Sequence, residues 1–271
     1  MQVTLVSYTQ DALDLLLFTK STRLKLSPRA MEEVKAWPPE KKQEELNYML
    51  GTIKSSWEFC DFVFLIQDVT RAFTHQLVRH RVGTAFAQQA QRVVDMSDFD
   101  YVTTGTIRDS DPAESSLQVV YDATMDNIHD GYQALLAAGA NPQDARGVLP
   151  TNICTNIIFK ANLRTLHQMA GERLCVKAQG EFQDVMRAMR DAVVAVYPWT
   201  EPMLRVHCAS TGVCCFPNYS YEQCPVKAGV FNPETGRRWD NKAWEQALTK
   251  QEIQDLWETH RAEAQPKGET S

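Results

Sequence analysis

The densest run of side chains able to do chemistry is Arg79-His80-Arg81, which follows Gln76 at the expected end of an apolar helix. Three adjacent cationic or titratable side chains cannot all point into a hydrophobic core. A solvated helix end explains an isolated run of this kind, because cations complement the dipole at a helix C-terminus. The alternative is a site for an anion, since the planar arginine fork pairs with phosphate oxygens.

The segments around this run favour the second explanation. From Arg81 the chain continues as Val-Gly-Thr-Ala-Phe-Ala-Gln-Gln-Ala-Gln to Arg92. A second block contains Arg146-Gly-Val-Leu-Pro150, Asn162-Leu-Arg164, Arg173 and Ala178-Gln179-Gly-Glu181. In order and approximate spacing, the two blocks resemble the flavin-dependent thymidylate synthases, whose signature is Arg-His-Arg, a short spacer and Ser-x-Arg. The resemblance covers about residues 1 to 200, and two spaced blocks are far more specific than Arg-His-Arg alone.

The resemblance implies two sets of binding residues, one for FAD and one for a pyrimidine deoxynucleotide monophosphate. The flavin would contact Arg79, His80, Arg81, Asn162, Arg164 and Gln168. The nucleotide would contact Gln76, Arg79, Gln88, Gln89, Ala90, Arg92, Arg146 and Arg173. Arg146 would reach the nucleotide from a neighbouring subunit, and Arg173 would be the catalytic group that faces and polarises the pyrimidine.

The implied reaction is methylation of dUMP at C5 to give dTMP, with methylenetetrahydrofolate as carbon donor and NADPH as reductant. Arginine suits the nucleotide phosphate, and a fixed cation in a water-poor site can stabilise charge on the uracil carbonyl. The family uses no enzyme nucleophile, so the seven cysteines need no catalytic role. The resemblance also implies an active site assembled between the subunits of a homotetramer.

Several positions depart from the family pattern. The signature serine is Ala90, the aromatic residue after the last arginine is Val93, and the spacer is one residue longer. Gln168 replaces an expected His or Asn, and Glu58-Phe59-Cys60 lacks a histidine that many members have before the strand preceding the signature. A lost hydroxyl removes a hydrogen bond worth about 0.5–1.5 kcal/mol.

These departures keep three alternatives open: C5 hydroxymethylation, dCMP as the substrate, or a non-catalytic homologue that binds flavin or nucleotide. The non-catalytic alternative is disfavoured by the retention of four arginines, namely Arg79, Arg92, Arg146 and Arg173. A nucleic-acid-binding module is disfavoured by the net charge of −6, because such modules reward basic clusters.

The elements that must position these residues can be predicted from periodicity and capping. Strands are expected at 2–8, 58–67 and 151–160. Helices are expected at 40–54, 70–79, 111–139, 162–175 and 182–196. An irregular loop (200–238) and an amphipathic tail (239–258) would follow. Without strict βαβ alternation, the pattern predicts an α+β fold with a mixed sheet and long helices.

We divide the 271 residues into a catalytic domain (1–205) and a Cys-rich loop with its tail (206–271). The second part contains a possible zinc-ligand set: His207, Cys208, Cys214, Cys215 and Cys224. Their spacing is not the paired Cys-x-x-Cys form, so a loop with free thiols is favoured over a metal site. The odd cysteine count and the lack of a signal or membrane-spanning pattern predict a cytoplasmic protein.

Overall fold

The computed structural model describes residues 1–20, 28–92, 94, 96–103, 105, 107, 116–175 and 177–211. Its centre is a four-stranded sheet in the order β1-β2-β4-β3. The strands are β1 (Gln2–Tyr8), β2 (Asp61–Thr70), β3 (Thr84–Gln88) and β4 (Cys154–Asn162). All three neighbouring pairs are antiparallel. The α+β class is confirmed, whereas the expected mixed sheet is wrong for these four strands.

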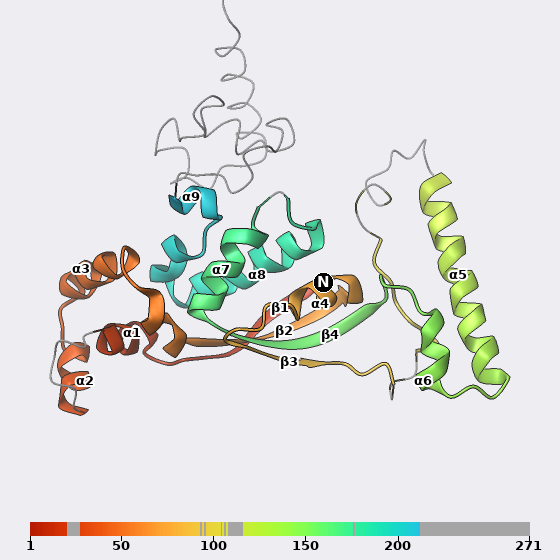
Figure 1. The fold of residues 1–271 in the computed structure, drawn as a ribbon, viewed down its shortest axis with the longest axis horizontal. Coiled ribbons are helices and arrows are strands. Elements are labelled where there is room, and N and C mark those ends of the chain that lie inside the picture. The colour runs from red at the N-terminus through yellow and green to blue at the C-terminus, as the bar shows by residue number, and fades with distance from the viewer. Residues whose placement is uncertain are drawn as a thin grey trace, which may run out of the picture.

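Alternating burial along the central strands is typical of an antiparallel sheet with one covered face. In β2, Phe62 and Phe64 are buried while the residues between them are partly exposed. Phe64 stacks on Phe159 of β4, with ring centroids 6.3 Å apart. Figure 1 shows α7 (Leu163–Arg173) and α8 (Gly180–Val196) over one face of the sheet. The buried face is therefore the platform for these two helices.

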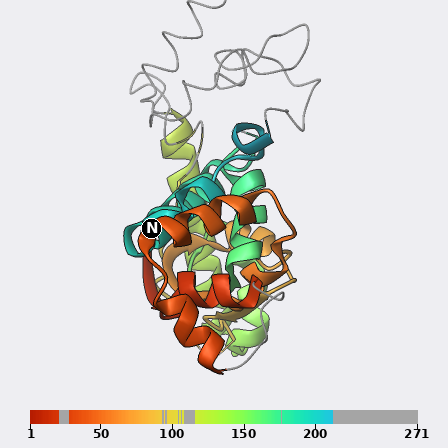
Figure 2. The same cartoon turned by 90° about the vertical axis from the view of Figure 1, so that its left-hand side faces the viewer.

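The other helices lie mainly at the two ends of the sheet (Figures 1 and 2). One end carries α1 (Ala12–Lys20), α2 (Pro28–Lys35), α3 (Pro39–Leu50) and the 3₁₀ helix η1 (Lys54–Phe59). The other end carries α5 (Ser116–Ala137), α6 (Pro142–Ala145) and the 3₁₀ helix η3 (Arg146–Val148). The short helices η4 (Pro198–Met203) and α9 (His207–Thr211) follow α8.

Two side-chain caps fix the helices that matter for the site. The chain leaves β2 and enters α4 (Arg71–Leu77) at Thr70, whose Oγ1 accepts a hydrogen bond from the Phe73 N–H at 2.9 Å. Asn162 Oδ1 accepts from the Thr165 N–H at 2.9 Å and so begins α7. Both helices start where capping predicts.

Three expectations need correction or fall outside the described residues. The strand expected at 58–67 starts three positions later, because Trp57 is buried from a 3₁₀ turn and not from a strand. The loop expected at 200–238 contains η4 and α9, and Pro198 suits the first position of a helix. The expected helix start at Asp111, the tail at 239–258 and the rest of the loop lie outside the described residues.

The chain beyond residue 205 still contacts the main body. A Cβ added to Gly171 of α7 would lie 3.6 Å from the His207 Cβ of α9, so these two helices are in close contact. The proposed boundary at 205/206 remains a prediction. Within the described part of the chain, no helix has both the length and the apolar character needed to span a bilayer.

Candidate functional site

The clearest constellation of predicted site residues joins the ends of α4 and α7. After α4 ends at Leu77, the His80 N–H donates to the Leu77 carbonyl at 3.1 Å and turns the chain. Arg173 closes α7, and its Nε donates to His80 Nε2 at 3.2 Å. Because a guanidinium only donates, His80 Nε2 must be the unprotonated, accepting nitrogen of the ring.

The first turn of α8 completes this constellation. Gln76 Nε2 donates to Gln179 Oε1 at 2.5 Å. The Arg173 guanidinium lies 4.7 Å from the centroid of the Phe182 ring, and the His80 ring meets the same ring edge-on at 6.0 Å. We call these five residues the inner group. Three of them (Gln76, His80 and Arg173) were predicted from the sequence, and two were not.

The electrostatics of the inner group keep His80 neutral. Burial lowers the pKa of His80 below its ordinary value of 6.5, and the neighbouring Arg173 lowers it further. Glu172 opposes the shift and raises this pKa. His80 can accept the Arg173 N–H only when its imidazole is neutral, and the lowered pKa favours that form at neutral pH.

The loop after Arg-His-Arg is tied to the start of α7. Gly83 has a φ of +69°, and an added Cβ there would lie 2.3 Å from Asn162 Nδ2. The Asn162 N–H donates to the Gly83 carbonyl at 3.1 Å, and Thr165 Oγ1 donates to the Val82 carbonyl at 2.7 Å. Asn162, predicted to bind flavin, is thus 6% exposed and serves as the cap of α7.

Four predicted arginines lie at the surface, and we call them the outer arginines: Arg79, Arg81, Arg92 and Arg146. None forms an ion pair with a carboxylate of the described residues. Arg146 Nε donates to the Gln143 carbonyl at 3.1 Å. Exposed cations without a protein anion suit a phosphate-bearing ligand.

Arg71 is only partly exposed and lies near the outer arginine Arg146, but the sequence did not predict it as a site residue. Burial and the nearby Arg146 both lower its pKa. Its buried Nη1 has no hydrogen-bond acceptor among the described residues. One signal could have found it: Arg71 is the first residue of α4, where a cation opposes the helix dipole. A cation at an unfavourable helix position is more easily explained by a ligand.

The predicted flavin contacts Arg164 and Gln168 share an exposed face of α7, four positions apart. Arg164 Nη1 forms an ion pair with Glu58 Oε1 at 2.5 Å. Both side chains of this pair are 46% exposed, so water screens their attraction. This exposed pair restrains the arginine only weakly, and the other terminal nitrogen, Nη2, remains available to a ligand.

The predicted nucleotide contacts at the end of β3 are partly occupied by the protein itself. Gln88 Nε2 donates to Thr74 Oγ1 at 3.0 Å. The Gln89 N–H donates to the Asn156 carbonyl at 3.0 Å, and Gln89 Oε1 accepts from Asn156 Nδ2 at 3.3 Å. Ala90 is exposed at the end of this segment. The structure thus places Gln88 to Ala90 at the end of β3, with Gln89 and Ala90 exposed.

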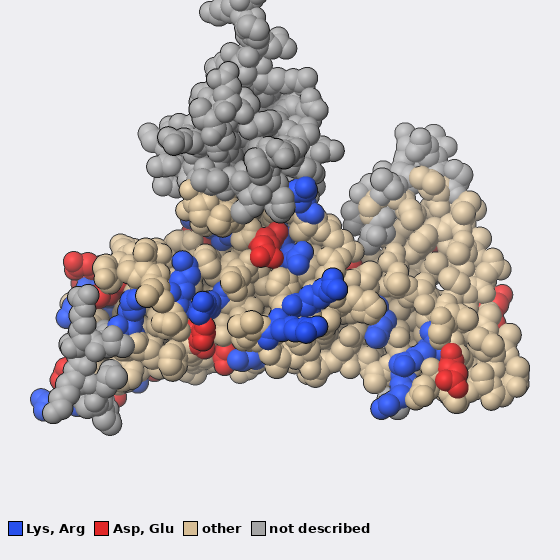
Figure 3. Space-filling view, in the orientation of Figure 1, with Lys and Arg blue, Asp and Glu red and all other residues tan. Residues whose placement is uncertain are grey.

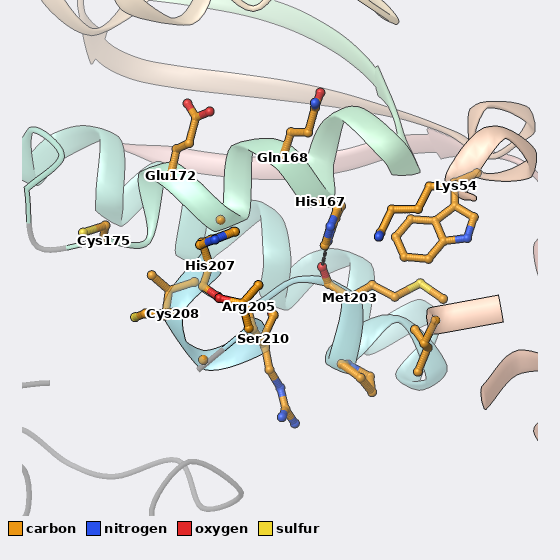
Figure 4. Close-up of a pocket in the computed structure, with 17 residues that line it drawn as sticks. Lys54, His167, Gln168, Glu172, Cys175, Met203, Arg205, His207, Cys208 and Ser210 are labelled. Carbon is orange, nitrogen blue, oxygen red and sulfur yellow. Dashed lines mark hydrogen bonds between the residues drawn. The ribbon is translucent and has the colours of Figure 1, made fainter. Parts of the chain in front are cut away.

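A cavity of about 780 Å³ lies behind α7, between η1, η4 and α9 (Figure 4). His167 points into it, and its Nδ1 donates to the Met203 carbonyl at 2.6 Å. Burial lowers the pKa of His167, and Lys54 and His207 lower it further, while that hydrogen bond opposes them. Gln168 also lines this cavity, but none of the five inner-group residues does. The cavity is therefore distinct from the inner group.

Two of the described cysteines, Cys60 and Cys154, show no sign of activation. Burial and then Asp61 raise the pKa of Cys60 to about 12, and burial raises that of Cys154 to about 11. Such thiols stay protonated at neutral pH and are poor nucleophiles. No group of three or more metal-ligating side chains occurs among the described residues, while Cys214, Cys215 and Cys224 lie outside them.

Basic side chains also gather on one face of the molecule. In Figure 3 they form a band across the middle of the face shown, over β3 and β4 and below α7 and α8. The net charge of the chain is −6, so this band is a local feature. A small anionic ligand is a better match to it than a nucleic-acid duplex.

Comparison with known proteins agrees with this chemistry. Residues 4–199 match the family described as thymidylate synthase complementing protein. A flavin-dependent thymidylate synthase of Pyrococcus furiosus is 30% identical over 222 residues, covering 79% of this chain and 88% of that protein. One of Clostridium tetani is 32% identical over 212 residues, covering 73% and 84%. One of Nitratidesulfovibrio vulgaris is 35% identical over 170 residues, covering 58% of this chain and 65% of its own length.

Proposed function

Because this chain belongs to the flavin-dependent thymidylate synthase family, we propose that it methylates dUMP at C5 to give dTMP. The proposal includes FAD as cofactor, methylenetetrahydrofolate as carbon donor and NADPH as reductant. The observation that carries it is the inner group, in which Arg173 meets His80 although the two lie 93 positions apart. This contact gives the chain a fixed, partly buried cation beside the predicted flavin and nucleotide residues.

Arg173 is the proposed catalytic group. Its Nε is committed to His80, so the terminal nitrogens of the guanidinium remain to donate to a pyrimidine carbonyl. The Phe182 ring covers one side of the guanidinium and limits its contact with water. A cation fixed in this way stabilises negative charge on the carbonyl oxygen as C5 becomes nucleophilic. Gln76 is held nearby by Gln179 and would help to orient the base.

The residues present suit FAD, whose pyrophosphate is anionic. Arg79 and Arg81 are exposed and unpaired with described carboxylates, so they can hold the pyrophosphate. Arg164 and Gln168 offer N–H donors from one face of α7. His80 would contact the flavin with its remaining ring N–H, because its Nε2 accepts from Arg173. Bound FAD would supply the hydride that reduces the transferred carbon, and NADPH would supply its electrons.

The nucleotide phosphate is assigned to the outer arginines Arg92 and Arg146, with Arg71 beside Arg146. Burial and then repulsion by Arg146 lower the pKa of Arg71, and a dianion between the two arginines would relieve that repulsion. It would also give the buried Arg71 Nη1 an acceptor. The short chain segment at Gln88 to Ala90 would border the same ligand.

We also propose that the active protein is a homotetramer with sites between subunits. The sheet face opposite α7 and α8 carries Leu65 paired with Ile158, and Ile158 is 46% exposed. On α5, Val119 and Val120 are 63% and 65% exposed. Apolar side chains exposed in these positions are typical of a surface that another subunit covers. The free thiols Cys60 and Cys154 are in keeping with the reducing cytoplasm.

The test is mass spectrometry of the products. Purified protein is incubated with FAD, NADPH, methylenetetrahydrofolate and either dUMP or dCMP. A product heavier than dUMP by one CH₂ unit supports the proposal. Bound flavin without any product would contradict it and favour a binding homologue. Light scattering on the same preparation measures the subunit number.

A second candidate function keeps the site but changes the outcome at C5, or takes dCMP. The observation that favours it is Ala90, which lies exposed where the family signature has a serine. Losing one hydroxyl near the nucleotide alters which groups on the ligand are satisfied. A hydroxymethylated product, or turnover of dCMP alone, would establish this candidate in place of the first.

A further inference from the structure

Gln179, the N-cap of α8, and Phe182 in its first turn contact the other three members of the inner group. Gln179 accepts a hydrogen bond from Gln76 at 2.5 Å. Glu181 Oε1 accepts from the Thr70 N–H at 2.7 Å, and Glu181 Oε2 accepts from Thr70 Oγ1 at 2.5 Å. These contacts fix both the beginning and the end of α4 relative to α8.

Phe182 continues this set of contacts from the core side. Its ring is fully buried and meets Phe73 of α4 edge-to-face, with centroids 4.9 Å apart. The same ring lies 4.7 Å from the Arg173 guanidinium and 6.0 Å from the His80 ring. One side chain therefore touches α4, the Arg-His-Arg turn and the C-terminus of α7.

We propose that Phe182 is a positioning residue for the reaction, which orients the Arg173 guanidinium toward the pyrimidine nucleotide by a buried cation–π contact. The proposal rests on the proposed function for the identity of that nucleotide. It assigns a role to a residue that the resemblance did not single out. Phe182 acts through Arg173 and needs no contact with a ligand.

The physical reason lies in how an arginine can be held. The hydrogen bond from Arg173 Nε to His80 fixes one atom of the guanidinium but leaves its plane free to swing. The face of an aromatic ring attracts a cation most strongly where water is excluded. Contact with Phe182 supplies this second restraint without using any of the terminal N–H groups. Those groups stay available for the substrate carbonyl.

Phe64 is a second buried phenylalanine, and it serves as a comparison because it contacts only the hydrophobic core. Phe64 is also fully buried, and its described ring contact is the stack on Phe159 at 6.3 Å. Both residues lie in the same hydrophobic cluster. Replacing either removes a similar amount of buried surface, but only Phe182 faces a predicted catalytic cation. The two positions form a matched pair for experiment.

The experiment compares Phe182→Leu and Phe182→Met with Phe64→Leu in the full-length protein loaded with FAD. The methionine variant keeps the site filled if the leucine variant packs poorly. Three quantities are measured: bound flavin per folded chain, dUMP affinity by calorimetry, and the pKa of His80 by NMR without nucleotide. The His80 measurement reports both the burial of its ring and the position of Arg173, because burial first and Arg173 second lower that pKa.

We expect normal flavin content and about tenfold weaker dUMP binding in both Phe182 variants. The pKa of His80 should rise toward 6.5 as Arg173 moves away. Phe64→Leu should lower thermal stability but change neither the dUMP affinity nor the pKa of His80. Wild-type dUMP affinity together with an unchanged His80 pKa in both Phe182 variants would overturn the proposal. If the wild type neither binds nor converts dUMP while the variants still raise this pKa, the proposed function fails and the positioning role stands.

Discussion

The inner group and the outer arginines are two kinds of cationic environment in one molecule. In the inner group Arg173 has a hydrogen bond, an aromatic ring beneath it and a half-buried setting. The outer arginines are exposed and have no carboxylate partner among the described residues. Burial and then the nearby Arg146 lower the pKa of Arg71. One region is organised by contacts within the chain, whereas the arginines of the other have no anionic partner among the described residues.

This difference indicates where preorganisation is built in. Dipoles and charges that are already oriented cost nothing to arrange when charge develops in a reaction. The group proposed to act on the pyrimidine is oriented by contacts within one chain. On the proposed function, the groups that hold phosphate would be ordered by the ligand or by a neighbouring subunit, so they would contribute to affinity and to assembly. Substitutions in the two regions should therefore fail in different ways.

The largest expected effect comes from Arg173→Ala. Removing the cation that faces the carbonyl should lower turnover at least about 100-fold, as loss of a preorganised donor does. Flavin should stay bound, because the flavin residues are untouched. Turnover is measured with saturating dUMP, and flavin is measured by absorbance. Near-normal turnover in this variant would remove the catalytic assignment of Arg173.

Arg146→Ala is the matched change in the outer region. It removes one phosphate contact and should raise the KM for dUMP with little change in kcat. If instead Arg146→Ala and Arg173→Ala both reduce kcat alone, the distinction between the two regions is wrong.

The next effect tests the tie between the Arg-His-Arg turn and α7. Gly83→Ala should destabilise the fold by about 2 kcal/mol or more, because the φ of +69° is strained for alanine and the new Cβ meets Asn162. Gly139→Ala is the control, since its φ of +95° is also positive but no atom lies within 4 Å of the added Cβ. Unfolding in urea measures both. Equal losses would show that contact with Asn162 contributes nothing.

Much of the fold could be predicted, since its signals are local. Thr70 and Asn162 are capping residues that lie directly before α4 and α7. Residues 58–60 were placed in β2 on aromatic content, but Trp57 and its neighbours form a 3₁₀ turn. The turn buries the indole without extending the strand, which composition cannot reveal.

The inner group could be predicted only in part, because its contacts are long-range. The resemblance gave Arg173 and His80, but no periodicity pairs Gln76 with Gln179, 103 positions away. Phe182 looked like one more apolar residue on an amphipathic helix. Its contact with a cation depends on how α8 crosses the end of α7, which is a property of tertiary packing.

A smaller effect concerns pH and the inner group. The folded-state pKa of His80 lies below the ordinary 6.5, mainly through burial and then Arg173, and that of His167 is also lowered. As the pH falls, the two histidines are protonated in the unfolded chain, near pH 6.5, before they are protonated in the folded protein. The stabilisation from the two neutral histidines is therefore fully present above that pH. It should be lost as the pH falls through the folded-state values. Thermal unfolding between pH 7.5 and pH 5 measures this, with roughly half-unit steps.

The His80→Asn variant separates the contribution of His80 to the pH dependence of stability from that of the other titrating groups. Its amide can still accept from Arg173 but takes up no proton in this range. The variant should lose part of the acid-induced destabilisation, and His167→Asn should lose another part. If neither variant flattens the pH profile, burial does not keep these rings neutral.

The smallest effect is expected from Ala90→Ser, which restores the signature hydroxyl two positions before the outer arginine Arg92. Ala90 is exposed, so the new side chain should change stability by less than about 0.5 kcal/mol. One added hydrogen bond to the nucleotide would tighten dUMP binding by about 0.5–1.5 kcal/mol. Ala87→Ser, an exposed change within β3, is the control and should leave affinity unchanged. Tighter binding in Ala90→Ser alone would show that the outer region is completed by the ligand, whereas equal affinity in all three proteins would place the nucleotide away from Ala90.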